Sequence, residues 1–223
     1  MNDVFTHQPD IVTAGTDLVI SLAAACFAAA VTVRHIKKSS IRRMCLLMFA
    51  AVFAAGIAGA ALHGLAAVSE SFAAEQVIRA FTAACLGGIA VPVIYICMYC
   101  ALGKPMASYF SKAAAILWAA AEAAAVISAA EGPVYVYAAV CIAFAAGSGI
   151  YCIAAGKAVE MVYLLICIAS AGAGLAVQNL LAEDKTLNLI LQFNHSGLAH
   201  LAVIAVLPLT YIWCDRIIQK YSD

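Results

Sequence analysis

Charged residues are scarce in this chain, and their scarcity excludes most soluble folds. Only 11% of its 223 residues are Asp, Glu, Lys or Arg, whereas a soluble domain carries about 25%. The 12 basic and 12 acidic residues balance, so no excess of positive charge indicates a nucleic-acid partner. The first ten positions also lack the basic residues with which a secretory signal begins. We therefore expect the first apolar run to stay in the protein as a membrane span.

Long apolar runs make up most of the chain, and 66% of its residues are hydrophobic. A helix needs about 20 apolar residues to cross a membrane. Several runs reach that length, and they lack the period of two that membrane strands show. We predict an all-α membrane protein: a single domain over residues 1–223 that forms a seven-transmembrane-helix bundle. Its helices are expected at about 11–33, 44–68, 77–103, 108–130, 133–156, 159–182 and 187–213.

The basic residues predict how the bundle is oriented. Only Arg79 and Lys185 fall on one side of the expected membrane. The other side carries Arg34, Lys37, Lys38, Arg42, Arg43, Lys104, Lys112, Lys157, Arg216 and Lys220. Loops rich in Lys and Arg stay in the cytoplasm, which places the N-terminus outside and the C-terminus inside. We expect a bacterial inner-membrane protein whose main partner is the lipid bilayer, with a lipid or small-molecule ligand.

The nine cysteines do not form a pattern typical of a disulfide framework. All lie within or beside apolar runs, and none falls in an expected outer loop. Cys97 and Cys100 form a CxxC inside an apolar helix, where cysteine commonly packs as a small hydrophobic residue. His35, in the first basic loop, is expected at the surface.

Ionisable side chains inside the apolar runs are the best chemical clue. Each costs about 2.5–3.5 kcal/mol at the centre of a membrane helix, so such residues usually face a cavity, a partner or a ligand. The set comprises Asp17, His63, Glu122, His195 and His200. Most lie about 8–12 Å below the outer ends of their helices, and His200 lies about 20 Å deep, at about 1.5 Å of rise per residue. We expect them to meet in one polar cavity in the outer half of the bundle.

The last helix carries the densest polar pattern. His195, Ser196 and His200 fall within an arc of about 140° on that helix. With His63 as a third ligand, the two helix-seven histidines would complete a three-histidine zinc site that leaves a position open for water. Asp17 or Glu122 would then orient a histidine or act as general base.

Several functions stay open for this set of residues. The histidines can simply form interhelical hydrogen bonds. A zinc site would support a metal-dependent hydrolase of a lipid amide or ester, with Asp17, Glu122 and Ser196 as catalytic residues. The alternative is a small-solute or proton-coupled transporter with Asp17, Glu122 and the histidines as relay groups. Haem between two histidines is a further option, while the lack of a lysine in the last helix argues against a retinal protein.

A resemblance to known proteins rests on Thr16-Asp17, His63-Gly64, Gln178 and the run from Phe193 to His200. Through them nearly the whole chain resembles a family of uncharacterised bacterial seven-helix membrane proteins, which implies the fold. The chain is more distantly similar to the membrane hydrolases that include alkaline ceramidases and the adiponectin and progestin receptors. In that superfamily a histidine late in helix two and a histidine pair in helix seven bind zinc. His63 matches the first of these positions and His200 matches the second histidine of the pair, while His195 is shifted by one residue from the first. The resemblance implies a zinc-bound water that acts on a lipid.

Overall fold

The computed structural model describes residues 8–68, 72–128, 132–181 and 195–221. This part of the chain contains helices and no strand, so the all-α prediction is confirmed for it. The helices are α2 (Gln8–Arg34), α3 (Ser40–Val68), α4 (Phe72–Leu102), α5 (Lys104–Ser128), α6 (Gly132–Ala154), α7 (Met161–Leu181) and α8 (His195–Tyr221).

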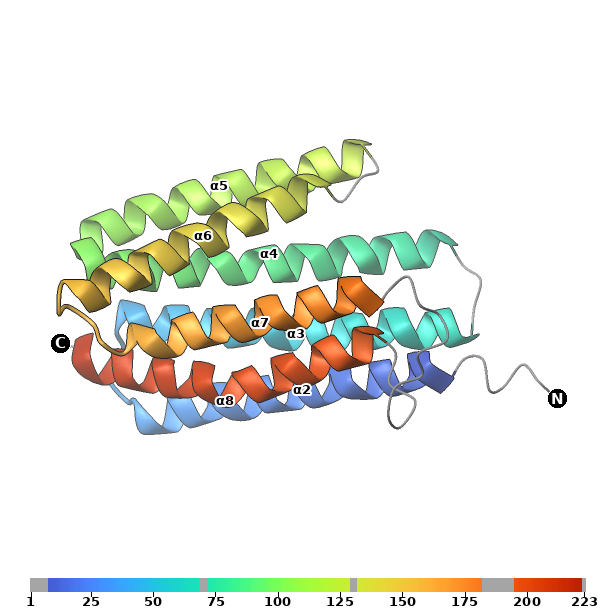
Figure 1. Ribbon diagram of the computed structural model, residues 1–223, viewed down its shortest axis with the longest axis horizontal. Helices are drawn as coiled ribbons and strands as arrows, with labels where there is room; N and C mark the ends of the chain where they lie inside the picture. Colours follow the sequence, from blue (N-terminus) through green and yellow to red (C-terminus); the bar gives the residue numbers. More distant parts are fainter. Residues whose placement is uncertain (1–7, 69–71, 129–131, 182–194, 222–223) are drawn as a thin grey trace.

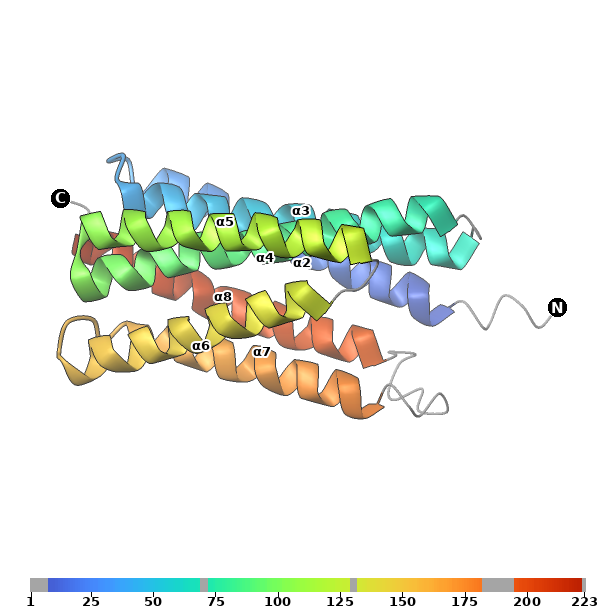
Figure 2. The same cartoon turned by 90° about the horizontal axis from the view of Figure 1, so that it is seen from above.

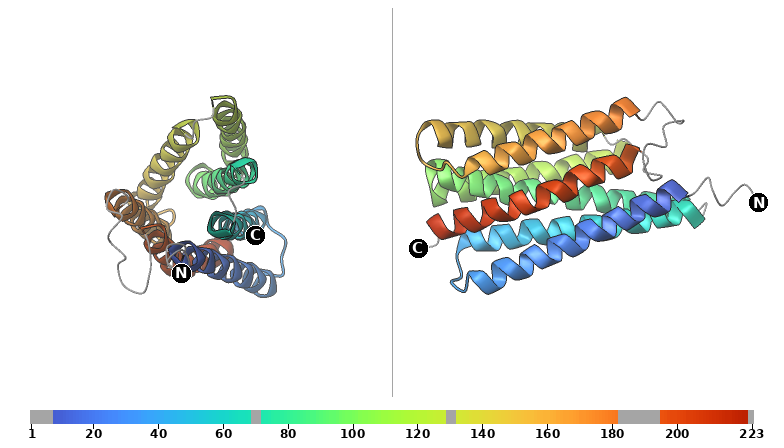
Figure 3. Two further views of the ribbon diagram at one scale, coloured as in Figure 1. Left: turned by 90° about the vertical axis from the view of Figure 1, so that its right-hand side faces the viewer. Right: turned by 60° about the horizontal axis from the view of Figure 1, so that its bottom comes forward.

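The helices run side by side along the long axis of the molecule (Figures 1 and 2), and α2 begins at the end opposite to the one where α8 ends. Each helix contacts the next one in the chain, and α2 also contacts α8, so the bundle closes into a ring. Seen end-on, α5 and α6 lie on one side and α2 on the opposite side (Figure 3). Within the ring, α2, α3 and α8 contact one another pairwise. These three helices build the candidate site.

The length and composition of the helices match a bilayer. Helices α2 to α6 and α8 are long and apolar enough to cross a membrane, which gives 6 candidate spans. The described residues of α7 contain a shorter apolar stretch, Met161–Gly174. A helix satisfies its backbone hydrogen bonds internally, which the bilayer interior requires. The chain is therefore an integral membrane protein.

The last helix differs most from its predicted bounds. Residues 187–194 of the expected span 187–213 lie outside the described residues, and α8 continues past Trp213 to Tyr221. The prediction ended where the apolar run meets Asp215 and Arg216. A charged residue ends an apolar run without ending a helix, because helical hydrogen bonds need only the backbone.

Local signals fix two of the other helix ends. The Ser39 hydroxyl accepts a hydrogen bond from the Arg42 backbone N–H at 3.1 Å and caps α3. Gly103 has a φ of +88° and separates α4 from α5. Glycine adopts this left-handed conformation without the steric cost that a side chain brings.

A buried carboxylate joins the ends of α2 and α8. Asp215 Oδ1 lies 2.8 Å from His35 Nε2 and 3.1 Å from Arg34 Nε. Its Oδ2 accepts a hydrogen bond from Gln219 at 2.9 Å. The His35 side chain is only 11% exposed, so the expectation of a surface histidine is wrong. His35 and Asp215 are 180 residues apart in the sequence. Their contact could not be predicted, because it depends on the packing of α2 against α8.

Asp215→Ala is expected to lower the free energy of unfolding by about 2 kcal/mol, because the largely buried His35 side chain loses its acceptor and Gln219 loses a hydrogen bond. Gln219→Ala removes one of these hydrogen bonds and is expected to cost about 1 kcal/mol. Unfolding by denaturing detergent, followed by circular dichroism, measures both. Equal stability of the Asp215→Ala and unaltered proteins would contradict the role of this carboxylate as a tie between α2 and α8.

Aromatic residues occupy the space between the two ends of α2 and α8. Phe27 of α2 stacks on Tyr211 of α8 with ring centroids 5.1 Å apart, and it lies 6.0 Å from Phe49 of α3. Ala24 and Val31, on the same helix, are fully buried. This apolar block separates the Asp215 contacts from the polar residues in the first half of α2.

Candidate metal centre

One face of α2 carries a buried polar row: Thr13, Thr16, Asp17 and Ser21. Their spacing of three and four residues places them on a single helix face. Asp17 is only 5% exposed, although burying an ionised carboxylate is costly unless a partner compensates its charge. The structure therefore has to supply that partner from the facing helices.

Helix α3 approaches this face through glycines. A Cβ at Gly59 would lie 2.7 Å from Asp17 Oδ2, and a Cβ at Gly56 would lie 2.8 Å from the Asp17 backbone oxygen. Any side chain at these positions would push into α2. Small residues in membrane helices permit such close packing. What the sequence did not reveal is that Gly59 gives room to the carboxylate itself.

Two histidines meet Asp17 from the other two helices. His200 Nδ1 of α8 lies 3.3 Å from Asp17 Oδ1, and His63 Nε2 of α3 lies 4.0 Å from Asp17 Oδ2. The two imidazole rings stand edge to face, with centroids 6.0 Å apart. One ligand atom from each of the three residues lies within 4.8 Å of the other two. The two histidine side chains are 23% and 22% exposed, so the buried carboxylate lies beneath two partly accessible imidazoles.

Thr16 fixes the orientation of His200. The Thr16 hydroxyl lies 2.7 Å from the Thr13 carbonyl oxygen and 3.0 Å from His200 Nδ1. A carbonyl only accepts, so the single hydroxyl hydrogen goes to Thr13 and the hydroxyl accepts from His200 Nδ1–H. In this tautomer the lone pair of the His200 imidazole is on Nε2. A metal-binding histidine typically donates its other ring N–H to such an outer partner.

Asp17 Oδ2 is the most informative atom of the cluster. It is buried and has no hydrogen-bond partner. A buried carboxylate oxygen without a partner lowers the stability of the fold by about 1–3 kcal/mol or more. A cation between Asp17, His63 and His200 would remove that cost. The ligand atoms of a tetrahedral zinc site lie about 3.3 Å apart, so the present spacing has to contract by on the order of 1 Å around an ion.

The structure brings together three of the predicted site residues and separates one. Asp17, His63 and His200 form the cluster, while Glu122 lies on α5, which contacts only α4 and α6 in the described part of the chain. Glu122 therefore does not join the other three. His195 and Ser196 form the start of α8, and their side chains lie outside the description, as do those of Gln178 and Asn179.

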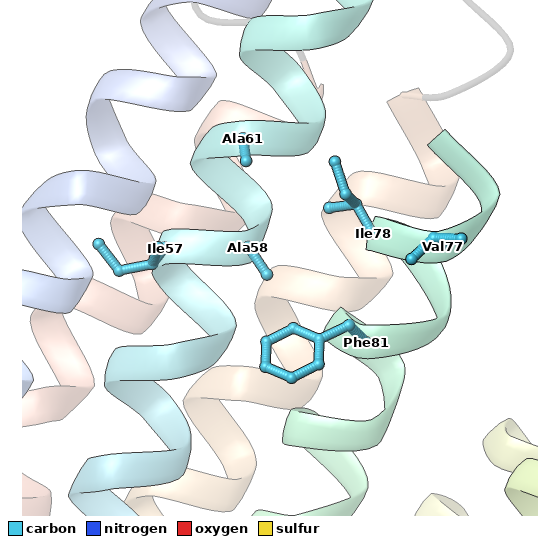
Figure 4. Close-up of a pocket in the computed structure, with 6 residues that line it drawn as sticks. All are labelled: Ile57, Ala58, Ala61, Val77, Ile78 and Phe81. Carbon is cyan, nitrogen blue, oxygen red and sulfur yellow. The ribbon is translucent and has the colours of Figure 1, made fainter. Parts of the chain in front are cut away.

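An apolar groove lies on another face of α3. It has a volume of about 270 Å³ and lies between α3 and α4, where Ala58 and Ala61 face Ile78 and Phe81 (Figure 4). Gly59 and His63 of α3 face α2 instead. The backbone of α3 thus separates this groove from the Asp17–His63–His200 cluster.

Comparison with known proteins gives one match. A family model described as "Family of unknown function (DUF6962)" matches residues 12–217, which include all three residues of the cluster. No curated protein and no solved structure matches the chain. The likeness to ceramidase-type hydrolases thus has no support from these comparisons.

Proposed function

The chain belongs to DUF6962, a family of unknown function, and we infer its function from its site. We propose that it is a membrane metalloprotein that binds Zn²⁺ through Asp17, His63 and His200. We further propose seven spans, with α7 as the seventh, an external N-terminus and a cytoplasmic C-terminus. The bias of Lys and Arg toward one end supports this orientation. With this orientation, the site lies in the external leaflet of the bacterial inner membrane.

The donor set favours zinc. Two imidazole nitrogens and one carboxylate are the ligands of many catalytic zinc sites, which keep a fourth position for water or substrate. The buried, unpartnered Asp17 Oδ2 is the observation that carries the proposal. The nearest described donor, His63 Nε2, lies 4.0 Å away, and a cation between the two groups would satisfy this acceptor.

Hydrolysis of a lipid amide or ester is the reaction that suits such a site. Bound zinc would lower the pKa of a water and polarise the substrate carbonyl. Asp17 stands about 8 Å below the outer end of its span, Val12–Arg34, a depth that the linkage region of a lipid can reach. Ser196 and His195, near the start of α8, are proposed to contact substrate rather than to hold the metal, because His63, His200 and Asp17 already supply three ligands.

Carrier function has less support. A proton or solute path has to lead from the outer cluster to the other end of the bundle, whereas Phe27, Phe49 and Tyr211 pack between the cluster and Asp215. Glu122, the second expected relay group, stands on a helix that does not contact α2, α3 or α8 within the described residues. Both observations favour a site that is open on one side.

Metal analysis of the purified protein tests the proposal. We expect about one zinc per chain in the unaltered protein and less than about a tenth of that in His63→Ala and His200→Ala, because each loses one of three ligands. His35→Ala is the matched control, since His35 binds Asp215 at the other end of the bundle, and it should keep its zinc. A folded, unaltered protein that takes up no zinc from a zinc-supplemented buffer would refute the proposal.

A further inference from the structure

A second groove opens between α4, α5 and α6. Its volume is about 480 Å³. It is lined by Met98 and Leu102 of α4, Phe110 of α5, and Phe144, Gly147 and Tyr151 of α6. Leu102 is 52% exposed and Tyr151 is 47% exposed, so the groove is open along its side. In an integral membrane protein, that open side faces the hydrocarbon of the bilayer.

A cation stands at one end of this groove. Lys157 Nζ donates hydrogen bonds to the Ala101 carbonyl oxygen at 2.7 Å and to the Tyr151 hydroxyl at 3.1 Å. Ala101 and Tyr151 both line the groove. An ammonium group has three donors, and these contacts use two of them. Lys157 is exposed and lies in the turn after α6, beyond the span Gly132–Ala154, where the headgroups of a bilayer begin.

We propose that this groove binds one phospholipid with an anionic headgroup. An acyl chain lies along the apolar wall between α4 and α6, and the headgroup phosphate accepts the remaining hydrogen bond of Lys157. The wall from Ala143 to Tyr151 rises about 12 Å along α6, which is a substantial part of one leaflet. Basic residues near the membrane surface attract anionic lipids, and this end of the bundle also carries Lys104.

The groove between α3 and α4 does not support the same inference. All the residues that line it are apolar, so nothing there selects one headgroup over another. Of these two grooves, the one at Lys157 combines an apolar channel with a cation and a phenol at its end. The lipid site also lies on helices other than those of the metal centre, so it does not depend on the proposed zinc site.

Gly147→Leu tests whether the groove holds the acyl chain. A Cβ at Gly147 would meet nothing within 4 Å, so a side chain can start there without a backbone shift and occupy the groove that Gly147 lines. Gly172→Leu on α7 is the matched control, since a Cβ at Gly172 also meets nothing within 4 Å. Native mass spectrometry of protein released from nanodiscs of phosphatidylglycerol and phosphatidylcholine counts the lipids retained. We expect about one retained lipid in the unaltered and Gly172→Leu proteins, and a loss of at least about fivefold in Gly147→Leu.

Lys157→Gln tests the headgroup contact. The unaltered protein should retain phosphatidylglycerol about fivefold more than phosphatidylcholine, the ratio that about 1 kcal/mol from one lysine provides. Lys157→Gln should lose that preference and Lys157→Arg should keep it. Lys220→Gln, which breaks a contact with Glu160 at the same end of the bundle, should leave it unchanged. Equal retention of the two lipids by the unaltered protein, or undiminished retention by a folded Gly147→Leu protein, would overturn the proposal.

Discussion

Asp17→Asn is expected to abolish zinc binding and, in the metal-free state, to raise the free energy of unfolding by about 1–3 kcal/mol. The substitution removes a metal ligand. It also replaces a buried carboxylate whose Oδ2 has no partner with a neutral group of nearly the same shape. A residue kept for function at a cost in stability behaves in this way. A residue kept for packing would show the opposite sign.

Unfolding of chelator-treated protein with and without added zinc separates the two effects. Zinc at about 100 times its dissociation constant should stabilise the unaltered protein by about 2.7 kcal/mol and leave Asp17→Asn unchanged. Thr210→Val is a control for the replacement of a polar side chain on another helix. The Thr210 hydroxyl has partners, the Val206 carbonyl oxygen and the Cys167 thiol, whereas Asp17 Oδ2 has none. If Asp17→Asn destabilises the metal-free protein, then the cluster of Asp17, His63 and His200 is a structural hydrogen-bond network.

The helices of this protein could be predicted because apolar runs of membrane length leave few alternatives. Their neighbours could not be predicted, since alanine-rich faces such as that from Ala119 to Ala125 carry no signal for a particular partner. The end of α8 was missed for a related reason. Asp215 interrupts the apolar run but stabilises the helix end through His35 and Gln219, and these contacts depend on the packing of α2 against α8.

The candidate site was predicted only in part, because depth was the only coordinate that related one helix to another. Depth placed Asp17, His63 and Glu122 at similar levels in the membrane. Depth does not say which helices touch, so Glu122 was grouped with residues of α2, α3 and α8. Glu122 lies on α5, which contacts α4 and α6 and none of those three helices in the described part of the chain. No role in the site was predicted for Thr13 or Gly59, although each lies four residues before a site residue on the same helix and therefore on the same face. The proposed substrate contacts of His195 and Ser196 stay predictions.

Gly59→Ala is expected to remove zinc binding without touching a ligand. The new Cβ would lie 2.7 Å from Asp17 Oδ2 and 2.9 Å from its Cγ, closer than real carbon and oxygen atoms approach. Because α2 and α3 pack closely here, the carboxylate has to rotate away or the helices have to separate. Either movement displaces the ligand by on the order of 1 Å. We expect at least a hundredfold weaker zinc binding, together with a loss of about 1–3 kcal/mol in stability from overpacking.

Gly64→Ala gives this prediction its control. It makes the same change next to His63 on the same helix, and its Cβ would meet nothing within 4 Å. That variant should bind zinc normally and gain up to about 1 kcal/mol from helix propensity. Zinc titration of both variants by calorimetry, beside the unaltered protein, compares them directly. If both glycine variants bind zinc with unchanged affinity, the metal does not lie against Asp17. If only Gly59→Ala fails, the site requires the close approach of α3 to the carboxylate of α2, which makes Gly59 as necessary to the metal centre as the residues that bind the ion.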